Sequence, residues 1–509
     1  MSKINNLNKN IILSDYAYLK RKAKVQYTLG KYNKSLAYIK AAANIAYHLN
    51  FQYTDDELEI LLTSISSKLL IAENTKHNEE KYVFYDSFGF DNRGLTEQYL
   101  NALISWNAKF LYILESETNV KYSSNILKKL KEYSNCEVII ISSKLTDAEK
   151  IEYAFKIINQ FKPTKSFLHL APWSIVGVCL FNAFPSLLKY RINLTDHAFW
   201  LGKSCTDYVI EFRNYGCNIS LKYRGIAPEK ILLQTFYPIQ NHSVFKGFPT
   251  ETSDKVILFT GGAFYKMYGE KGKFFDLVKR ILNENQNAIL FIAGSGNMKP
   301  MNTFIEKNNF KSRVFLLGNR NDINEVFKNI DIYLATYPLS GGLMAQYAAV
   351  NHKSIIAFTS NDLPCNFTDG IINTPPHIKL TYTNEDAFCE EASKLIRDKQ
   401  YRDEKSSILT ESVITENKFN VDLQKLIEKN TPYQVINMDI PTEKFFQLYL
   451  DTENNFLHSY YSILFSNLRF NIFLKPQIAV RFIISIILSY PIYLNMILNK
   501  FGNIFNPKK

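Results

Sequence analysis

The chain alternates short, almost continuous apolar segments with amphipathic segments, and it does so twice. The first series contains YVFYD, FLYIL, EVIIIS and SFLHL between Tyr82 and Leu170, and the second contains VILFT, AILFIA, VFLL, IYLAT and SIIAF between Val256 and Phe358. Strands that are apolar on both faces are typical of parallel sheets covered by helices. The pattern therefore predicts an α/β chain with two tandem Rossmann-like domains, whose facing strand ends would form a cleft.

The segments outside the two series are expected to be helical. Apolar residues recur at helical spacing between Tyr16 and Asn50 and are interrupted at Leu29-Gly30-Lys31, which predicts a helical hairpin. The run YTLGKYNKSLAYIKAA is similar to part of one tetratricopeptide repeat, but no clear second copy follows, so we expect a helical cap. The predicted boundaries are 1–76 for the helical N-terminal region, 77–245 and 250–408 for the two Rossmann-like domains, 409–470 for a helical region and 471–509 for apolar helices.

The composition indicates in which compartment the protein is found and which kinds of partner it binds. Lys and Arg outnumber Asp and Glu by 60 to 48, and the resulting net charge of +12 should attract phosphates, nucleotides or anionic lipid. The hydrophobic content of 46% excludes a disordered or fibrous chain. The 6 cysteines form no CxxC pair, and the N-terminus has no apolar run typical of a signal peptide. We therefore expect a cytoplasmic protein without a disulfide framework or a zinc ribbon.

The C-terminal segment has a different composition from the rest. Residues 482–499 carry no charge, but Pro491, Asn495 and Asn499 interrupt a run that is barely long enough to span a bilayer. Upstream, FLHSYYSILFSNLRFNIFLKP alternates aromatic residues with single basic ones, as segments lying among lipid headgroups do. The pattern favours a peripheral anchor on the inner face of the cell membrane. A terminal helix packed across a domain is the alternative.

Glycine turns follow four strands of the second series. They are Thr260-Gly261-Gly262, Gly294-Ser295-Gly296, Gly318-Asn319-Arg320 and Ser340-Gly341-Gly342. Open parallel sheets bind ligands beyond the carboxyl ends of their strands, and glycine lets the backbone approach a ligand closely. The recurrence of glycine along one sheet edge therefore predicts a ligand site there.

The last of these turns opens the expected helix LMAQYAAV. A helix N-terminus after Gly341 and Gly342 offers free N–H groups and a positive dipole end to a diphosphate. Gln346, about one turn into this helix, could reach a ribose hydroxyl or simply solvate a helix face. Lys266 and Lys271 lie in the loop after VILFT, where either would neutralise a leaving phosphate or remain merely solvated.

The first series contributes a different set of side chains. Its first strand ends at Asp86, and a glycine loop around Gly94 leads into a helix on the other side of the expected cleft. His197 beside Asp196 is the preferred candidate for acid/base or substrate-orienting chemistry, since imidazole exchanges protons near neutral pH. His169 is the second candidate. Either histidine can instead be a hydrogen-bonded core residue.

Several motifs are missing from the sequence. No two aspartates are spaced as DxD, the metal–diphosphate grip of one large class of sugar transferases. HExxH, the P-loop pattern, GxGxxG after a first strand and GxSxG are also absent, which argues against a zinc protease, a P-loop NTPase, an ordinary dehydrogenase and an α/β-hydrolase. We therefore expect no metal requirement and no cofactor beyond the substrates.

Residues 256–358 resemble the nucleotide-binding domain of GT-B glycosyltransferases. The resemblance rests on a strand ending in Gly-Gly, the EKG loop at 270–272, the turn IAGSGN, the run VFLLGNRNDINEVFKNIDIYLATYP and the segment GGLMAQYAAVNHKSII, in that order. Gln346 stands where many relatives have an acidic residue, and Pro338 stands where the large retaining family has a glutamate. The Tyr-Pro before the glycines is closer to the O-GlcNAc transferase branch, whose members carry helical repeats ahead of the catalytic domains.

The resemblance implies roles for the residues singled out above. Lys271, with Lys266, would steady the diphosphate leaving group, and Gly261, Gly262, Gly341 and Gly342 would let it approach. Asn319 and Arg320 would flank the base of a UDP- or GDP-linked sugar. His197 and Asp196 would face the acceptor or the sugar. The GT-B family generally stabilises the diphosphate with protein groups and a helix dipole, without a metal.

These observations lead to one preferred hypothesis and two alternatives. The preferred hypothesis is a glycosyltransferase that moves a sugar from a nucleotide donor to a glycan or lipid-linked acceptor, as in bacterial surface-polysaccharide synthesis, without a nucleic-acid partner. The first alternative is a protein glycosyltransferase, suggested by the helical N-terminus. The second is a non-catalytic membrane-bound scaffold with a degenerate nucleotide fold, suggested by the replaced acidic positions.

Overall fold

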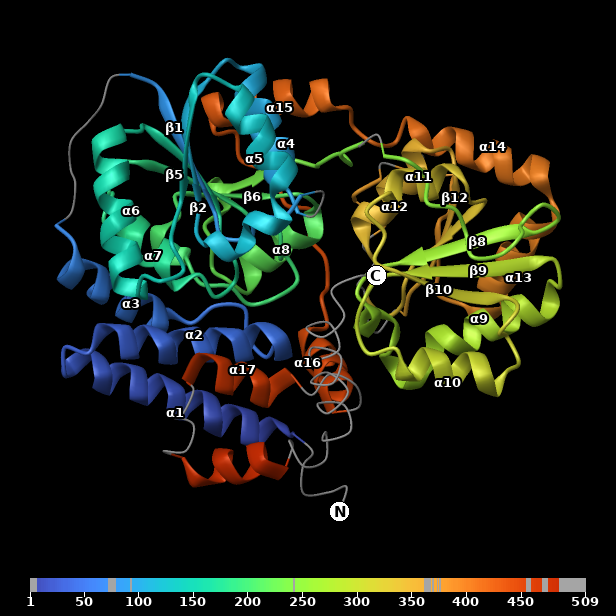
Figure 1. Cartoon of the computed structure of the whole chain (residues 1–509), viewed down its shortest axis with the longest axis horizontal. Helices are drawn as coiled ribbons and strands as arrows, with labels where there is room; N and C mark the ends of the chain where they lie inside the picture. The colour runs from blue at the N-terminus through green and yellow to red at the C-terminus, as the bar shows by residue number, and fades with distance from the viewer. Residues whose placement is uncertain are drawn as a thin grey trace, which may run out of the picture.

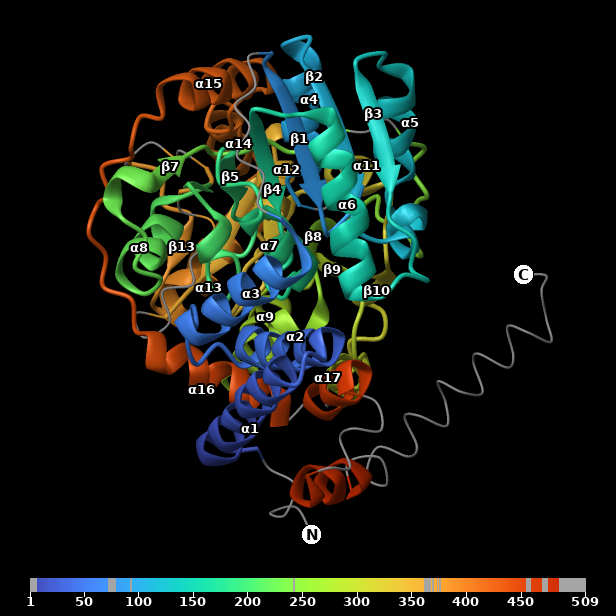
Figure 2. The ribbon, with the colours of Figure 1, turned by 90° about the vertical axis from the view of Figure 1, so that its left-hand side faces the viewer.

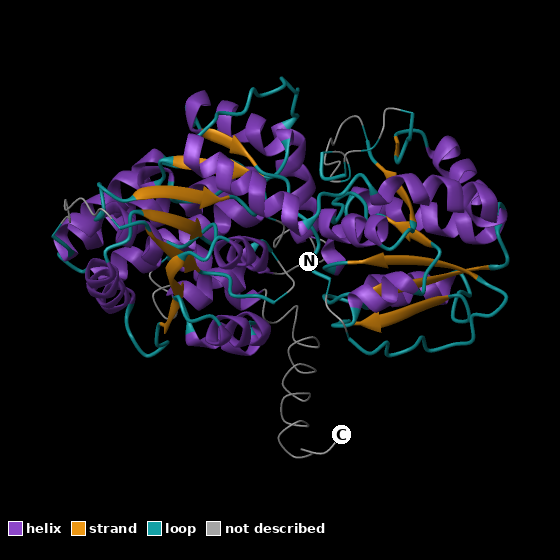
Figure 3. Ribbon diagram, turned by 90° about the horizontal axis from the view of Figure 1, so that it is seen from above, coloured by secondary structure: helices purple, strands orange, loops and turns teal. Residues whose placement is uncertain are grey.

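The computed structural model has two parallel β-sheets in separate lobes (Figures 1 and 3). It describes residues 7–71, 79–91, 94–240, 243–360, 368, 370–372, 374, 377–454, 459–468 and 475–484. Both sheets carry helices on their faces. The prediction of an α/β chain with two parallel-sheet domains is confirmed.

The first sheet has 7 strands in the order β3-β2-β1-β4-β5-β6-β7. Its strands are β1 (Lys81–Asp86), β2 (Lys109–Leu114), β3 (Cys136–Ile140), β4 (Lys165–His169), β5 (Leu188–Ile192), β6 (Tyr208–Glu211) and β7 (Ile231–Leu233). Strand β1 pairs in parallel with β2 and β4, so that Phe84 lies beside Tyr112 and Phe167. Asp86 and His169 end neighbouring strands, and this register brings them side by side.

The helices that alternate with these strands along the chain are α4 (Thr96–Ser105), α5 (Ser124–Glu132), α6 (Asp147–Phe161), α7 (Ile175–Asn182) and α8 (Asn214–Lys222). A capping box between Thr146 and Glu149 starts α6. Helix α7 is apolar on almost every side, because it is enclosed between the sheet and a further layer of helices.

That further layer is formed by the N-terminal helices α1 (Lys9–Thr28), α2 (Tyr32–Leu49) and α3 (Asp56–Leu69) (Figure 2). Helices α1 and α2 meet at Leu29-Gly30-Lys31, where the sequence predicted the break. Glu59 of α3 accepts hydrogen bonds from the backbone N–H groups of Gly202 (2.7 Å) and Ser204 (3.0 Å). The layer is therefore fastened to the loop that follows β5.

The second sheet has 6 strands in the order β10-β9-β8-β11-β12-β13. They are β8 (Val256–Gly261), β9 (Ala288–Ala293), β10 (Val314–Gly318), β11 (Ile332–Leu334), β12 (Ser354–Phe358) and β13 (Thr381–Tyr382). Its helices are α9 (Lys273–Glu284), α10 (Lys299–Lys307), α11 (Ile323–Lys328), α12 (Gly342–Val350), α13 (Glu385–Arg397) and α14 (Lys399–Thr410). All strand pairs in this sheet are parallel, so the glycine turns after β8, β9 and β10 share one edge.

After α14 the chain returns to the first lobe (Figure 1). Helix α15 (Glu416–Lys429) packs against α4, and the indole Nε1 of Trp106 donates to the Asn420 carbonyl oxygen (3.1 Å). Helix α16 (Thr442–Thr452) then contributes Leu448 to a cluster that contains Tyr53 and Leu339. Because Tyr53 belongs to the N-terminal layer and Leu339 to the second lobe, α16 joins the two.

Helix α17 (Ser459–Leu468) and the helical segment 476–484 pack beside α1 and α2, and a buried charge cluster joins them. Asp15 is 1% exposed and accepts hydrogen bonds from Lys475 (2.6 Å), Arg481 (2.6 Å) and Tyr460 (2.9 Å). No helix among the described residues is long and apolar enough to cross a bilayer. Residues 485–509, which carry most of the expected membrane anchor, lie outside the described part of the chain, as do Asn92 and Arg93 of the expected glycine loop.

Replacing Asp15 by Asn should loosen the C-terminal helices. The change leaves Lys475 and Arg481 partly buried without a counter-charge, and removing one member of a buried ion pair costs about 3–5 kcal/mol. Hydrogen exchange measured by mass spectrometry should become faster in α17 and in residues 476–484. Glu443→Gln is the matched control, because it breaks an exposed ion pair with Lys9 (3.1 Å), which is worth about 1 kcal/mol or less. Unchanged hydrogen-exchange protection of α17 in the Asp15 variant would contradict the claim that Asp15 holds the C-terminal helices in place.

Candidate functional site

The glycine turns at the carboxyl edge of the second sheet touch one another. The N–H of Gly262 donates to the Ala293 carbonyl oxygen (3.0 Å), and the N–H of Gly294 donates to the Gly318 carbonyl oxygen (2.8 Å). A Cβ atom on Gly294 would lie only 1.9 Å from the Gly262 carbonyl oxygen. Gly262 and Gly294 also have φ values of +145° and +143°, which favour glycine. At this contact the two turns therefore meet through backbone, with the Phe264 side chain packed against Gly294.

Helix α12 begins beside these turns. A Cβ atom on its N-cap residue, Gly341, would lie 3.9 Å from the Gly261 carbonyl oxygen, with space around it. The N-cap carries no side chain that could accept from the first-turn N–H groups, and residues 341–344 are only half-buried. Ser340, just before them, is 7% exposed. Among the described residues no side chain caps the first turn of α12, so its N–H groups and dipole are suited to an anion at this terminus.

Lys266 lies next to this helix terminus. Its carbonyl oxygen accepts from the Leu339 N–H (3.3 Å), and its side-chain Cδ lies 3.7 Å from the Cβ position of Gly262. Burial lowers the pKa of the Lys266 ammonium, and no carboxylate of the described residues contributes an opposing effect. A half-buried cation without a protein counter-ion is costly unless an anion joins it.

The second predicted lysine is placed differently. Lys271 is exposed, with φ +55°, in the short 3-10 turn Glu270–Gly272. The neighbouring Glu270 accepts a hydrogen bond from the Tyr337 hydroxyl (2.8 Å), which ties this turn to the Tyr337-Pro338 segment. Lys271 therefore lies at the rim of the same region, while Lys266 lies inside it.

The structure places three predicted nucleotide contacts, Gln346, Arg320 and Asn319, in different surroundings. Gln346 is fully buried, and its Nε2 donates to the Phe236 carbonyl oxygen (2.7 Å), so it joins α12 to the segment between the lobes instead of facing solvent. Arg320 binds both carboxylate oxygens of Asp322 and the Gly247 carbonyl oxygen, so its guanidinium is already paired within the second lobe. Asn319 is exposed and stays a candidate for that contact.

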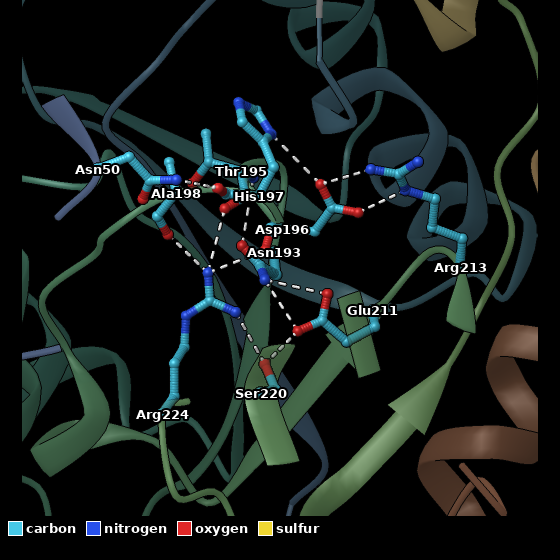
Figure 4. Close-up of polar contacts among 10 residues, drawn as sticks. All are labelled: Asn50, Asn193, Thr195, Asp196, His197, Ala198, Glu211, Arg213, Ser220 and Arg224. Carbon is cyan, nitrogen blue, oxygen red and sulfur yellow. Dashed lines mark hydrogen bonds and ion pairs between the residues drawn. The ribbon is translucent and has the colours of Figure 1, made fainter. Parts of the chain in front are cut away.

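In the first lobe, Asp196 and His197 lie on a loop that buried groups hold from several sides (Figure 4). Arg213 donates from Nε to Asp196 Oδ2 (2.5 Å) and from Nη2 to Asp196 Oδ1 (3.1 Å). Burial alone would raise the pKa of Asp196, but the Arg213 guanidinium and His197 lower it to about 2. Asp196 is therefore a permanent anion that orients its neighbours and is unsuited to proton transfer.

His197 keeps contact with this anion. Its Nδ1 lies 3.3 Å from Asp196 Oδ1, and its side chain is 21% exposed. The Asn50 side-chain amide donates to the His197 carbonyl oxygen (2.9 Å), so the end of α2 helps to fix the loop. An Nδ1–H directed at Asp196 leaves Nε2 as the ring atom that can exchange a proton.

Two further residues beneath the loop were not anticipated from the sequence. Arg224 donates from Nη2 to the carbonyl oxygens of Asp196 (3.0 Å) and Ala198 (2.6 Å). Glu211, which is fully buried at the end of β6, accepts from the side chains of Ser220 and Asn193. Burial raises the pKa of Glu211 to about 7. The sequence around α8 is typical of a polar surface helix, and nothing in it indicates that Arg224 and Glu211 are buried.

His169 belongs to a separate buried network. Its Nδ1 lies 3.1 Å from Asp86 Oδ1 and 3.0 Å from the Thr96 hydroxyl, and its ring is fully buried. Its Nε2 has no partner among the described residues and lies 3.9 Å from the Cβ position of Gly94. Although burial alone would raise the pKa of Asp86, the hydrogen bond with His169 lowers it. The structure does not bring His169 together with His197.

Comparisons with known proteins identify the fold through similar structures and find no relative by sequence. No family model and no curated protein matches the sequence. The structure of the Anabaena protein HepE in complex with UDP and glucose is similar at a TM-score of 0.50 and 11% identity, covering 69% of this chain and 100% of that one. A mutant of the O-GlcNAc transferase of Thermobaculum terrenum is similar at a TM-score of 0.51 and 13% identity, covering 86% of this chain and 84% of that one. The chain has the GT-B fold.

Within the GT-B fold, the two groups described above belong to different halves. The glycine turns, α12 and Lys266 come from the C-terminal half, and the Asp196–His197 loop comes from the N-terminal half. A Cβ atom on Gly370, in the C-terminal half, would lie 3.4 Å from Cβ of Arg213, so the two halves meet beside the ion pair that holds this loop. Among the described residues no cluster of His, Cys, Asp or Glu is arranged to hold a metal ion.

The buried Glu211 should give the protein a pH-dependent stability. Its pKa of about 7 in the folded protein exceeds its ordinary value of 4.5, so the folded state retains a proton that the unfolded state loses. The resulting stabilisation, on the order of 3 kcal/mol, is present below pH 4.5 and lost as the pH rises to about 7. Urea denaturation at pH 5 and pH 8 should show a smaller loss of stability in Glu211→Gln than in the wild type.

The exposed Glu137 on β3 provides the control for this measurement. Glu137→Gln should leave the pH dependence of the wild type unchanged. Parallel stability curves for the wild type and Glu211→Gln would contradict a proton held by Glu211.

Proposed function

We propose that this chain is a glycosyltransferase that uses a nucleotide-diphosphate sugar. The proposal is supported by one observation: the half-buried Lys266 side chain has no carboxylate partner among the described residues and packs with its Cδ beside the turn at Gly262, while the Lys266 carbonyl oxygen accepts from the Leu339 N–H just before α12. A cation and a helix N-terminus directed at one place are suited to the diphosphate of a leaving nucleotide. UDP is the preferred nucleotide, since HepE was solved in complex with UDP and glucose.

In the proposed reaction the bond between the sugar's anomeric carbon and the diphosphate oxygen breaks as an acceptor hydroxyl attacks that carbon. Negative charge grows on the departing diphosphate, where Lys266 and the N–H groups of α12 stabilise it without a metal ion. Lys271 at the rim is a second cation for the same phosphates. Closure of the two halves around the donor would exclude water that would otherwise hydrolyse it.

We assign the acceptor side to His197. Its Nε2 would accept the proton of the attacking hydroxyl, or orient that hydroxyl, while the Asp196 anion stabilises the ring through Nδ1. The acceptor class proposed is a glycan or a lipid-linked sugar, in keeping with polysaccharide synthesis at the inner face of the membrane. That location rests on the composition of residues 471–509 alone.

The purified chain should bind UDP and release it from a UDP-sugar when a sugar acceptor is supplied. Isothermal titration with UDP and GDP identifies the nucleotide, and a coupled assay of nucleotide release measures the reaction. Binding of neither nucleotide would contradict the proposed function and would favour the scaffold alternative. Transfer to peptides but not to sugars would redirect the proposal toward protein glycosylation.

Replacing Lys266 by Met should weaken UDP binding without destabilising the folded protein. The loss of charge-assisted hydrogen bonds should weaken UDP binding by roughly 10- to 100-fold. The free energy of unfolding of the ligand-free protein should stay the same or rise, because the variant no longer buries an unpaired charge. Titration calorimetry and urea denaturation of the same preparation measure the two effects.

Lys271→Met is the matched control for this experiment. Because Lys271 is exposed, its replacement should change UDP affinity less than Lys266→Met does and should leave stability unaltered. If UDP affinity is unchanged in Lys266→Met but lost in Lys271→Met, the diphosphate binds at Lys271 and the role proposed for Lys266 is wrong.

A further inference from the structure

Four aromatic side chains gather where the N-terminal helices meet both halves of the fold. Tyr47 and His48 end α2, Trp173 lies in the loop after β4, and Tyr265 belongs to the 3-10 turn Phe264–Met267 after β8. The ring centroids of Tyr47 and Trp173 are 5.2 Å apart at an interplanar angle of 71°, and His48 stacks on Trp173 at 6.1 Å and 17°. Burial, with Tyr265 as a neighbour, raises the pKa of Tyr47. We call these four residues the aromatic cluster.

The polar ends of the aromatic cluster are the feature that points to a ligand. All four side chains are half-buried, yet within the described part of the chain none of their hydroxyl, indole or imidazole groups makes a hydrogen bond. Tyr and Trp usually pair these groups when they are buried. Burial also lowers the pKa of His48 to about 4, so its ring is neutral near pH 7 and can both donate and accept.

The aromatic cluster is connected along the chain to both parts of the candidate site. Tyr265 directly precedes Lys266, the cation proposed for the diphosphate. His48 is close in sequence to Asn50, whose side-chain amide binds the His197 carbonyl oxygen (2.9 Å). A ligand held by the cluster would therefore lie near the leaving group and near the proposed proton acceptor.

We propose that the aromatic cluster binds an uncharged pyranose ring of the acceptor. A pyranose has an apolar C–H face and a rim of hydroxyl groups, so it matches aromatic faces whose N–H and O–H groups are free. None of the four side chains carries a charge at neutral pH, which disfavours an ionic group in this position. The inference rests on the proposed function and goes further, because it makes α2 part of the acceptor site and makes the acceptor a sugar.

Binding of simple glycosides tests this proposal directly. The probes are methyl β-D-glucopyranoside and methyl N-acetyl-β-D-glucosaminide, with saturation-transfer NMR as the readout in the presence of UDP. The wild type should bind at least one probe, and Trp173→Ala should weaken that binding by about tenfold or more. Tyr47→Phe, which removes only a hydroxyl, should weaken it less. UDP affinity, measured by calorimetry on the same samples, should be unchanged within about twofold in both variants.

Controls separate this inference from folding and from the proposed function. Tyr153→Ala removes an exposed tyrosine from α6 and should bind the glycosides as the wild type does. If Trp173→Ala does not fold, Trp173→Phe keeps the ring and loses the N–H, and it should still bind the probes more weakly. Glycoside binding that is equal in the wild type and the Trp173 variants, or absent while UDP binds normally, would overturn the acceptor subsite. Failure of UDP binding in the wild type would overturn the proposed function instead.

Discussion

The close approach of Gly262 and Gly294 is the constraint on which the account of this site depends. A methyl group on Gly294 would collide with the Gly262 carbonyl oxygen at 1.9 Å, so the two turns can meet only as bare backbone. That contact leaves the carboxyl edge of the second sheet free of side chains, apart from those that arrive from the Lys266 turn and from α12. In the proposed function the Lys266 ammonium and the N-terminus of α12 bind the diphosphate together, and no carboxylate among the described residues pairs with Lys266.

On the N-terminal half, buried charged side chains hold the candidate loop in place. Arg213 and Arg224 are buried beneath the Asp196–His197 loop, where one binds the aspartate carboxylate and the other binds its backbone. The N-terminal helices add Asn50 to this loop and Tyr47 to the aromatic cluster. The helices ahead of the first sheet therefore help to hold the loop that the proposed function assigns to the acceptor.

The sheets and the glycine edge could be predicted from the sequence, because both arise from local patterns. Strands buried on two faces, such as VILFT and AILFIA, must be continuously apolar, and a parallel sheet then places the glycine turns that follow them on one edge. The break at Leu29-Gly30-Lys31 is a signal of the same local kind. Partnerships between distant segments leave no such pattern, so nothing in the sequence indicated that α15 returns to α4.

Burial and pairing of polar side chains explain where the structure differs from the sequence-based expectations for the site. Lys266 and Lys271 are equivalent in the sequence, and only packing against Gly262 and Leu339 distinguishes the first from the second. Gln346 has the spacing of a ribose contact but fills a position between α12 and the Phe236 carbonyl oxygen. Arg320 has a neighbour, Asp322, that satisfies it locally. In each case the surroundings of the side chain in the folded protein, which residue type and spacing do not specify, distinguish it from the sequence-based expectation.

A crystal structure of the full chain with UDP tests the central claim most directly. The account predicts diphosphate density in front of the first turn of α12, with the Lys266 Nζ within hydrogen-bond distance of a phosphate oxygen and the backbone at Gly262 against it. Density for the nucleotide elsewhere on the molecule, or Lys266 turned toward a protein carboxylate in the complex, would contradict it.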